Sequence, residues 1–327
     1  MDTVSHIMIG FGLGALAQMD PMISTDSTLS TAVLIGTVVG SNAPDFDFMY
    51  RLKGKSCYYR NHRGLSHSLP AILIWSLLIS TCLLIPFTGT SFSHLFFWTL
   101  LAVSIHVLFD LFNVNGTQAF RPFSSKWFSL DFLPLVDPYI IMFHILGFSL
   151  LPFYAPGSVF SVIYLVIVFY LLIRLTAALL LKRKLTLHFQ NALQIKLIPK
   201  TSPFQWSILI ETDLDFLFGT YSQSQLWIEH TFSKKIEYPE LVLYSCKDQQ
   251  VDNFLRSTHY AFPFVQKRKS GYFIYWKDLR FRSKKFFPKL AIVFISLGNE
   301  KQVSYSGKLV SIKHYKRVIK NLAASTK

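Results

Sequence analysis

The chain has 327 residues and a formal net charge of +15. Hydrophobic residues make up 51% of it and charged residues 16%, whereas soluble globular proteins contain about 25% charged residues. This composition excludes intrinsic disorder, a coiled coil and an ordinary soluble enzyme, and it predicts a membrane protein with a polar appendage. The 3 cysteines are scattered and form no CxxC pair, which argues against a disulfide framework or a thiolate zinc cluster.

The charge is divided unevenly along the chain. Residues 1–181 contain 8 basic and 8 acidic side chains, and residues 182–327 contain 25 basic and 10 acidic ones. The whole net charge therefore lies in the second part, and the composition changes most sharply at Lys182-Arg183-Lys184. We predict a membrane-embedded helical domain over 1–181 and a basic cytoplasmic β-rich domain over 182–327.

The first domain begins with two short apolar runs and continues with four long ones. The short runs, 4–19 and 31–43, predict short helices or half-membrane segments, and the sequence leaves open whether they cross the membrane. The long runs can each cross a bilayer as a helix. They cover roughly 69–87, 92–113, 135–154 and 158–181. We therefore expect an α-helical polytopic membrane bundle.

Basic residues between these spans predict the orientation of the chain. The loops 44–68 and 114–134 and the segment 182–184 carry basic residues, and all three fall on one side of the four spans. The segments on the other side, 88–91 and 155–157, carry no charge. Because basic loops stay in the cytoplasm, we expect a multi-pass protein of the cell membrane with a cytoplasmic C-terminal domain.

Beyond residue 184 the apolar pattern changes to a period of two. Such alternation predicts strands where turn residues bound it. The alternating residues are Leu185, Leu187, Phe189, then Phe204, Trp206, Ile208, Ile210, and later Tyr272, Ile274, Trp276. A turn is expected at 269–271 and a closing helix at 311–324. The second domain is thus predicted to be small and mainly antiparallel β.

An unusual set of polar residues interrupts the apolar first domain. Each is a histidine or an aspartate, and these side chains together bind transition metals. The candidate metal ligands are His6, Asp45, Asp47, His62, His67, His106 and Asp110. By the predicted topology all but His6 lie at the cytoplasmic face, and His6 joins them if the N-terminus is inside.

His106 and Asp110 lie four residues apart inside an apolar span. This spacing places both side chains on one face of a helix, one turn apart. Ionisable residues within a span usually pair, bind an ion or line a cavity. A His–Asp hydrogen bond that only stabilises the bundle is one interpretation. A shared metal site fits better because further ligand types gather nearby.

The loop 44–68 holds the other candidates. In an extended segment Asp45 and Asp47 would point their carboxylates to one side, and a helix-capping role is the alternative. His62 and His67 lie on either side of Arg63, and two solvated histidines near lipid headgroups are the alternative for them. The cluster as a whole favours metal binding over these separate explanations.

The donor set predicts the metal and its chemistry. Histidines with aspartates suit zinc best, with manganese or iron as alternatives, and they do not suit calcium. A bridging aspartate could hold two ions about 3.5–4 Å apart, so one or two ions are expected. We assign Asp45, Asp47 and Arg63 to catalysis, with Arg63 holding a phosphate or carboxylate group. A plain topological charge is the alternative for Arg63.

These motifs resemble a known family of bacterial membrane proteins. The segments that match are Thr3–His6, Gly40–Asp47, His62–Ser68 and His106–Asp110. They are similar to the membrane-bound, LexA-regulated metal-dependent hydrolases of the YdjM type, over roughly residues 1–180, and the length and C-terminal domain resemble the Bacillus YfhP branch. The order of the motifs is also distantly similar to zinc-dependent phospholipase C and P1-type nucleases, an analogy that implies phosphodiester or phospholipid hydrolysis.

Several other residues are expected to have structural roles. His94 and His144 are isolated and are expected to contact neighbouring helices or the interface. Asp137 is expected to cap a helix. The glycines of the first apolar run are expected to permit close helix packing; they are Gly10, Gly12 and Gly14.

Residues 266–289 carry nine basic side chains and one acidic one, with aromatic residues between them. This segment could bind nucleic acid through phosphate contacts and base stacking. It could equally dock on the anionic inner leaflet, and we favour membrane lipids as the partner because the domain is tethered there.

Three functions compete. The leading hypothesis is a membrane-bound metal-dependent hydrolase whose active site lies at the cytoplasmic face and acts on a phosphoester or lipid-like substrate. The alternative is a non-enzymatic regulator whose basic domain binds DNA, protein or anionic lipid. A metal or proton transporter would need polar residues through the whole membrane depth, and the outer halves of the four long runs contain few.

Overall fold

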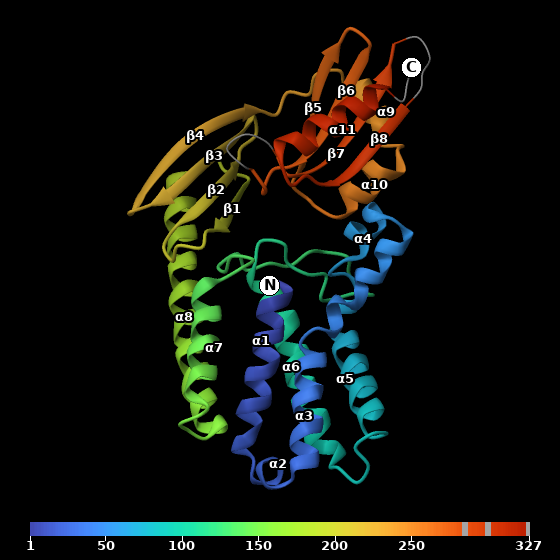
Figure 1. Ribbon diagram of the computed structural model, residues 1–327. Helices are drawn as coiled ribbons and strands as arrows, with labels where there is room; N and C mark the ends of the chain where they lie inside the picture. Colours follow the sequence, from blue (N-terminus) through green and yellow to red (C-terminus); the bar gives the residue numbers. More distant parts are fainter. Residues whose placement is uncertain (283–286, 298–301, 325–327) are drawn as a thin grey trace. The chain divides into compact units, whose positions relative to one another are not determined.

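The computed structural model describes residues 1–282, 287–297 and 302–324 (Figure 1). The chain forms two compact units. The first contains Met1–Phe46, Arg63–Thr212 and Leu217–His230, and the second contains Asp47–His62, Asp213–Phe216 and Thr231–Lys327. Each unit is built from segments that are distant in the sequence, so neither is a simple half of the chain.

Helices make up most of the first unit. Three of them, α1, α3 and α6, lie side by side in Figure 1, and α5 and α8 pack against this group. The elements are α1 (Thr3–Leu16), η1 (Ala17–Met19), α2 (Pro21–Thr25), α3 (Ser27–Gly40), η3 (Leu65–His67), α5 (Leu69–Leu83), α6 (Phe92–Phe112), α7 (Pro138–Leu150) and α8 (Pro156–His188). The 3₁₀ segment η2 (Ala43–Lys53) begins in this unit.

Polar side chains begin several of these helices. Asp2 accepts hydrogen bonds from the backbone at the start of α1, and Ser68 does the same for α5. Asp137 accepts hydrogen bonds from the amides of Tyr139 and Ile140, which confirms its predicted capping role. Each such cap stabilises a helix by about 1 kcal/mol because it satisfies backbone N–H groups that have no partner within the helix.

The glycines of α1 allow its neighbours to approach closely. A Cβ atom at Gly10 would lie 2.4 Å from Ser41 Oγ, and one at Gly14 would lie 2.5 Å from Leu34 Cδ1. A Cβ atom at Gly12 would lie 2.8 Å from the ring of Phe160 on α8. The predicted packing role is confirmed, and α1 is held against α3 at a separation that a larger residue would not permit.

Two helices are long and apolar enough to cross a membrane by length and composition, among the described residues: α6 and α8. A third candidate is the bent pair Lys55–His67 and Leu69–Leu83, if these segments form one span. Helix α5 ends at Leu83 and α7 has 13 residues, so both are shorter than predicted. Thirteen helical residues cover about 20 Å, less than the roughly 30 Å of a bilayer core.

Helix α8 contains a charged residue, Arg174, that is fully buried. Its Nε and Nη2 donate to the carbonyl of Phe132, at 3.1 and 2.8 Å, and its Nη1 donates to the carbonyl of Ser202 at 3.4 Å. The guanidinium also lies over the ring of Trp206. Protein groups therefore replace the solvation that an arginine loses within an apolar helix.

The expectation of a strand at Leu185, Leu187 and Phe189 is wrong. Helix α8 continues through the basic residues 182–184 to His188. The reason is visible in the burial: Leu181 and Leu185, one helical turn apart, are both buried, so the helical period extends past the change in charge. The predicted boundary at 181/182 stays a prediction, and α8 passes it without a break.

The strands form two four-stranded sheets in the described residues. The first has the order β1-β2-β3-β4, and β1 pairs antiparallel with β2. Its strands are β1 (Gln194–Pro199), β2 (Trp206–Glu211), β3 (Asp215–Ser222) and β4 (Gln225–Ser233). Trp206, Ile208 and Ile210 join the apolar core of the first unit, as their predicted alternation requires.

The second sheet lies in the second unit and is antiparallel throughout, in the order β5-β6-β7-β8. Helices α9 and α10 cover one face and α11 covers the other, so the predicted closing helix is confirmed (Figure 1). The elements are α4 (Lys55–Asn61), α9 (Pro239–Ser245), α10 (Gln249–Arg256), β5 (Ala261–Arg268), β6 (Gly271–Asp278), β7 (Lys289–Ser296), β8 (Gln302–Lys308) and α11 (Ile312–Ala324).

We predict that Gly10→Ala lowers the stability of the protein. The added methyl group would meet Ser41 Oγ and, at 2.8 Å, the backbone of Val38, and backbone cannot move aside as a flexible side chain can. Overpacking of this kind costs about 1–3 kcal/mol. Thermal unfolding in detergent measures the change, with Thr31→Ala on the exposed side of α3 as the control. A melting temperature equal to that of the control would contradict the packing argument.

Candidate metal centre

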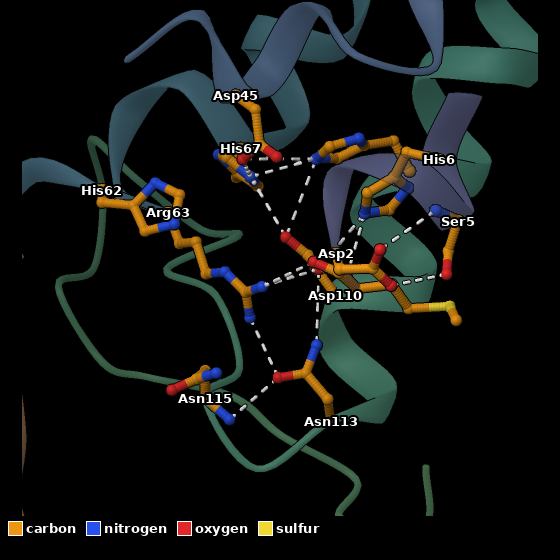
Figure 2. Close-up of polar contacts among 12 residues, drawn as sticks. Asp2, Ser5, His6, Asp45, His62, Arg63, His67, Asp110, Asn113 and Asn115 are labelled. Atoms are coloured by element: carbon orange, nitrogen blue, oxygen red, sulfur yellow. Dashed lines mark hydrogen bonds and ion pairs between the residues drawn. The ribbon is translucent and has the colours of Figure 1, made fainter. Parts of the chain in front are cut away.

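Four of the predicted ligands converge at one point of the first unit (Figure 2). They are Asp45 from η2, His67 from η3, and His106 and Asp110 from α6. One donor atom from each lies within 4.8 Å of every other. The side chains of the last three are completely buried, and that of Asp45 is 24% exposed. The cluster therefore opens toward solvent on the side of Asp45.

The distances between the donor atoms suit a tetrahedral ion. His67 Nε2 lies 3.3 Å from His106 Nε2, 3.3 Å from Asp110 Oδ2 and 3.5 Å from Asp45 Oδ1. His106 Nε2 lies 3.7 Å from Asp110 Oδ2 and 3.8 Å from Asp45 Oδ1. Ligands bonded to one tetrahedral zinc ion at about 2.0–2.2 Å are separated by about 3.3–3.6 Å. The printed donor separations are therefore close to those expected at the corners of a tetrahedron around one zinc ion.

The hydrogen bond of His106 fixes which of its nitrogens faces the cluster. Its Nδ1 lies 2.6 Å from the carbonyl oxygen of Ser41. A carbonyl only accepts, so Nδ1 carries the proton and donates it. In a neutral imidazole Nε2 then presents a lone pair to the cluster. This arrangement, with the second nitrogen held by a backbone carbonyl, is the usual one for a metal-binding histidine.

The ring of His67 has one Nε2–H at most, which is too few donors for the acceptor atoms that surround it. Its Nδ1 lies 2.9 Å from Ser66 Oγ, and its Nε2 faces the acceptor atoms of His106, Asp45 and Asp110. One N–H can serve only one of three acceptors well. Asp110 Oδ2 is buried and accepts no hydrogen bond among the described residues. A cation at this point would satisfy all of these lone pairs at once.

Asp45 is held in its charged form. Burial alone would raise the pKa of its carboxyl group, but the hydrogen bond with His67 and the nearby His106 hold that pKa well below the usual range. The carboxylate is therefore ionised at neutral pH, as a ligand or a base must be.

His6 lies beside the four ligands. Its ring stacks on that of His106, with the centroids 3.8 Å apart, and its Nε2 lies 3.6 Å from Asp110 Oδ1. The α-amino group of Met1 contacts both His6 Nε2 and Asp110. The structure thus places His6 beside the four ligands, and that it binds metal stays a prediction. The amino group was not foreseen, because no side-chain motif marks it.

Arg63 is directed at Asp110. Its Nη2 lies 2.9 Å from Asp110 Oδ1, and its Nη1 donates to Asn113 Oδ1 at 2.9 Å. Asn113 in turn donates to Asp110, so an arginine and an amide fix the orientation of this carboxylate (Figure 2). Arg63 has a φ of 62°, a left-handed conformation that is uncommon for a residue with a side chain. This conformation has a cost that the buried ion pair with Asp110 offsets.

Asp47 and His62 pair with each other in the second unit. Their side chains are joined by a hydrogen bond of 2.8 Å between His62 Nδ1 and Asp47 Oδ1. The expectation that Asp45 and Asp47 lie in an extended strand is wrong, because both belong to the 3₁₀ segment η2. That Asp47 and His62 bind metal stays a prediction.

The two isolated histidines lie elsewhere. His94 contacts Asp20 at 3.4 Å, and His144 Nδ1 donates to the carbonyl of Ile140. Neither belongs to a ligand cluster in the part of the chain that the structure describes. They serve as matched controls for the ligands.

Comparison with known proteins places the chain in a family through its first 181 residues. The sequence profile of the YdjM inner membrane protein matches residues 1–181. This chain belongs to the YdjM family. The YdjM profile includes every predicted ligand from His6 to Asp110. A second profile, the YfhP C-terminal alpha/beta plait domain, matches residues 240–319, which contain the second sheet.

A curated relative of this YdjM-family chain covers its full length. It is the "Uncharacterized protein YfhP" of Bacillus subtilis (strain 168), which is 37% identical over 326 residues, or 98% of this chain and 99% of the relative. The expected YfhP branch is thereby confirmed. No solved structure matches the chain.

We predict that His106→Ala and Asp110→Ala abolish metal binding. Each removes one of the four donor atoms that lie within 4.8 Å of one another. Asp45→Asn should weaken binding because it removes a charge from a side chain that is partly exposed. Metal content of detergent-purified protein, measured by mass spectrometry, tests this for zinc, manganese and iron.

His94→Ala and His144→Ala are the matched controls, and both should keep the metal. The melting temperature of each variant reports whether it folds. Equal metal content in the folded His106→Ala variant and in the controls would contradict a metal centre at this site.

Proposed function

We propose that this YdjM-family protein is a membrane-bound, metal-dependent hydrolase of phosphoesters. The observation that supports this most is the convergence of Asp45, His67, His106 and Asp110, whose donor atoms all lie within 4.8 Å of one another, with His67 and His106 at 3.3–3.8 Å from each other and from both carboxylates. A metal site needs several lone pairs directed at one point, and these four side chains can supply them.

The donor chemistry favours zinc over the other candidates. Two imidazole nitrogens and two carboxylate oxygens suit zinc, and manganese or iron accept the same set. When bound, such an ion polarises a phosphoryl oxygen and lowers the pKa of water. The ligands on α6 would hold the ion rigidly, because both side chains are buried and their helix is packed on α3.

We assign Asp45 to contact with the attacking water and the substrate. It is the only one of the four ligands with an exposed side chain, at 24%, so water and substrate would approach along it. Its carboxylate is ionised and can accept a proton from water. Asp47 remains a second candidate for catalysis, through its pair with His62.

Arg63 has a positioning role in this proposal. Its guanidinium orients Asp110 and adds positive charge beside the cluster. An anionic phosphoester is attracted to such a site more than a neutral ester is. A direct bond from Arg63 to the substrate phosphate, as the sequence suggests, would compete with its contact to Asp110.

We further propose a multi-pass topology with the C-terminal domain in the cytoplasm. The spans α6 and α8 and the basic residues of the loops 44–68 and 114–134 support it. The metal centre would then lie at the cytoplasmic face, because Asp110 is in the last turn of α6.

We predict that the zinc-loaded protein hydrolyses bis(p-nitrophenyl) phosphate and that His67→Ala lowers the rate at least about 100-fold, the scale of losing one major catalytic contribution. Release of p-nitrophenol measures the rate. A chelator should abolish it and added zinc should restore it. The control His144→Ala should keep full activity. A fully zinc-loaded protein that hydrolyses no phosphomonoester, phosphodiester or phospholipid would contradict the hydrolase proposal.

A second candidate function rests on the charges of the second unit. The exposed charged residues of α11 are all basic: Lys313, Lys316, Arg317 and Lys320. Acidic residues lie instead in or beside α9 and α10, on the other face of the sheet: Glu237, Glu240, Asp248 and Asp252. This segregation supports a non-enzymatic role in which the α11 face binds an anionic membrane surface.

Among its described residues, the segment 266–289 offers fewer exposed aromatic and unpaired basic side chains for binding an anionic partner than its composition predicts. Phe273, Tyr275 and Trp276 are buried in the sheet core, where they cannot stack on bases. Arg280 pairs with the buried Asp278. Burial lowers the pKa of Lys277 to about 8, and its amino group lies over the ring of Phe264. The structure therefore favours an electrostatic surface over the stacking platform considered from sequence.

We predict that Lys316→Glu/Arg317→Glu weakens binding to anionic vesicles. Each basic residue near such a surface contributes about 1 kcal/mol, and the loss should be smaller at high salt. The full chain in phosphatidylcholine nanodiscs is mixed with phosphatidylglycerol vesicles, and co-sedimentation is measured. Lys247→Glu/Arg256→Glu makes the same charge change on the other face and should bind normally. Equal binding by both variants, or binding to a DNA duplex instead, would contradict this role.

A further inference from the structure

Exposed apolar side chains gather in two segments of the first unit that adjoin the metal centre. We call them the apolar ridge: Leu65, Leu69, Phe120, Phe123, Phe128 and Leu130. Phe123 is 90% exposed and Leu65 is 55% exposed, so neither is explained by packing within the chain. A soluble surface would not carry so many large apolar groups together.

Backbone hydrogen bonds join these two segments to each other and to the cluster. The amide of Gln118 donates to the carbonyl of Arg63, and the amide of Leu69 donates to the carbonyl of Ala119, both at 2.9 Å. Leu65 and Leu69 each lie two residues from His67. The ridge is therefore anchored to the segment that carries a metal ligand.

A second set of contacts shapes the ridge itself. The backbones of Thr117 and Phe128 exchange two hydrogen bonds, at 3.0 and 2.9 Å. The rings of Phe120 and Phe128 pack edge to face, with centroids 4.9 Å apart. Phe123 lies in the segment between these two paired residues, and its side chain is 90% exposed.

The end of α6 relates the ridge to a candidate membrane span. The helix ends at Phe112, and the amide of Leu130 donates to the carbonyl of Leu111 in its last turn. With α6 as a span, Leu130 would lie level with the point where that span leaves the apolar core. At this depth aromatic residues and basic side chains are the usual contacts with lipid, and the same turn carries Arg121 and Lys126.

We propose that the apolar ridge lies in the membrane interface and delivers membrane phospholipids to the metal centre. This inference rests on the proposed hydrolase function and names its substrate class. In the reaction the oxygen of water bonds to phosphorus, the phosphoester P–O bond breaks, and a proton from water ends on the leaving alcohol. The ridge would bring a phospholipid from the membrane to the metal centre, whereas a water-soluble phosphoester can reach the centre from solvent.

The first part of the test measures where the ridge lies. A spin label on Phe123→Cys, in a full chain whose Cys57, Cys82 and Cys246 are serine, is placed in phosphatidylcholine–phosphatidylglycerol vesicles. Label accessibility to oxygen and to a water-soluble nickel chelate is measured. We expect oxygen to relax the label more than nickel does. A label at Lys269→Cys, an exposed position in the β5–β6 turn, should show the opposite. A Phe123 label that is open to nickel, or shielded from both reagents as in a contact with a second copy, would overturn the inference.

The second part measures turnover of two substrates by the zinc-loaded protein. Phe123→Ser should lower hydrolysis of vesicle phospholipid at least about tenfold, because interfacial contact scales with buried apolar area. Zinc content and hydrolysis of bis(p-nitrophenyl) phosphate should stay unchanged. Equal phospholipid turnover by the variant and the wild type would overturn the inference while leaving the hydrolase proposal intact. If the wild type hydrolyses neither substrate, the hydrolase proposal fails, and the inferred delivery of phospholipid fails with it.

Discussion

Asp110 places a carboxylate at the end of an apolar helix, beyond the reach of solvent, and much of the first unit is arranged around it. A buried charge without a partner is too costly to persist. Arg63, His6 and His67 approach it from three other segments, and Asn113 orients it. The glycines of α1, the helix that carries His6, allow close packing of that helix against α3 and α8. An ion shared by Asp110, Asp45 and the histidines would complete this neutralisation.

The sequence predicts contacts between site residues best where they lie in a regular helix, because the helical period determines which side chains share a face. His106 and Asp110 could be paired from spacing alone, because one helical turn brings them to the same face. Asp45 and His67 could be proposed from their chemistry and from the side of the membrane on which the charges place them. The ion pair between Arg63 and Asp110 could not, since it depends on a left-handed residue in an irregular loop. The pairing of Asp47 with His62 depends on a 3₁₀ segment that no apolar pattern marks.

In the basic part of the chain, the apolar pattern predicted some elements correctly and one element wrongly. Alternation correctly placed strands β2 and β6, and the closing helix expected at 311–324 is α11. Three alternating apolar residues after Lys184 fit a strand and a helix end equally well, and the buried stripe of α8 continued through them. Composition also could not say which side of the sheet a residue faces. The aromatic residues of 266–289 are therefore mostly core, and the segregated charge lies on α11 instead.

The buried arginine of α8 has a consequence for how the protein is made. Arg174 must enter an apolar environment with its charge, yet its carbonyl partners come from different times of synthesis. Phe132 precedes it by 42 residues and is already present, whereas Ser202 follows it by 28 residues. The contact with Ser202, in the loop between β1 and β2, can therefore form only after that loop has been synthesised, whereas the contacts with Phe132 need only chain that precedes the helix.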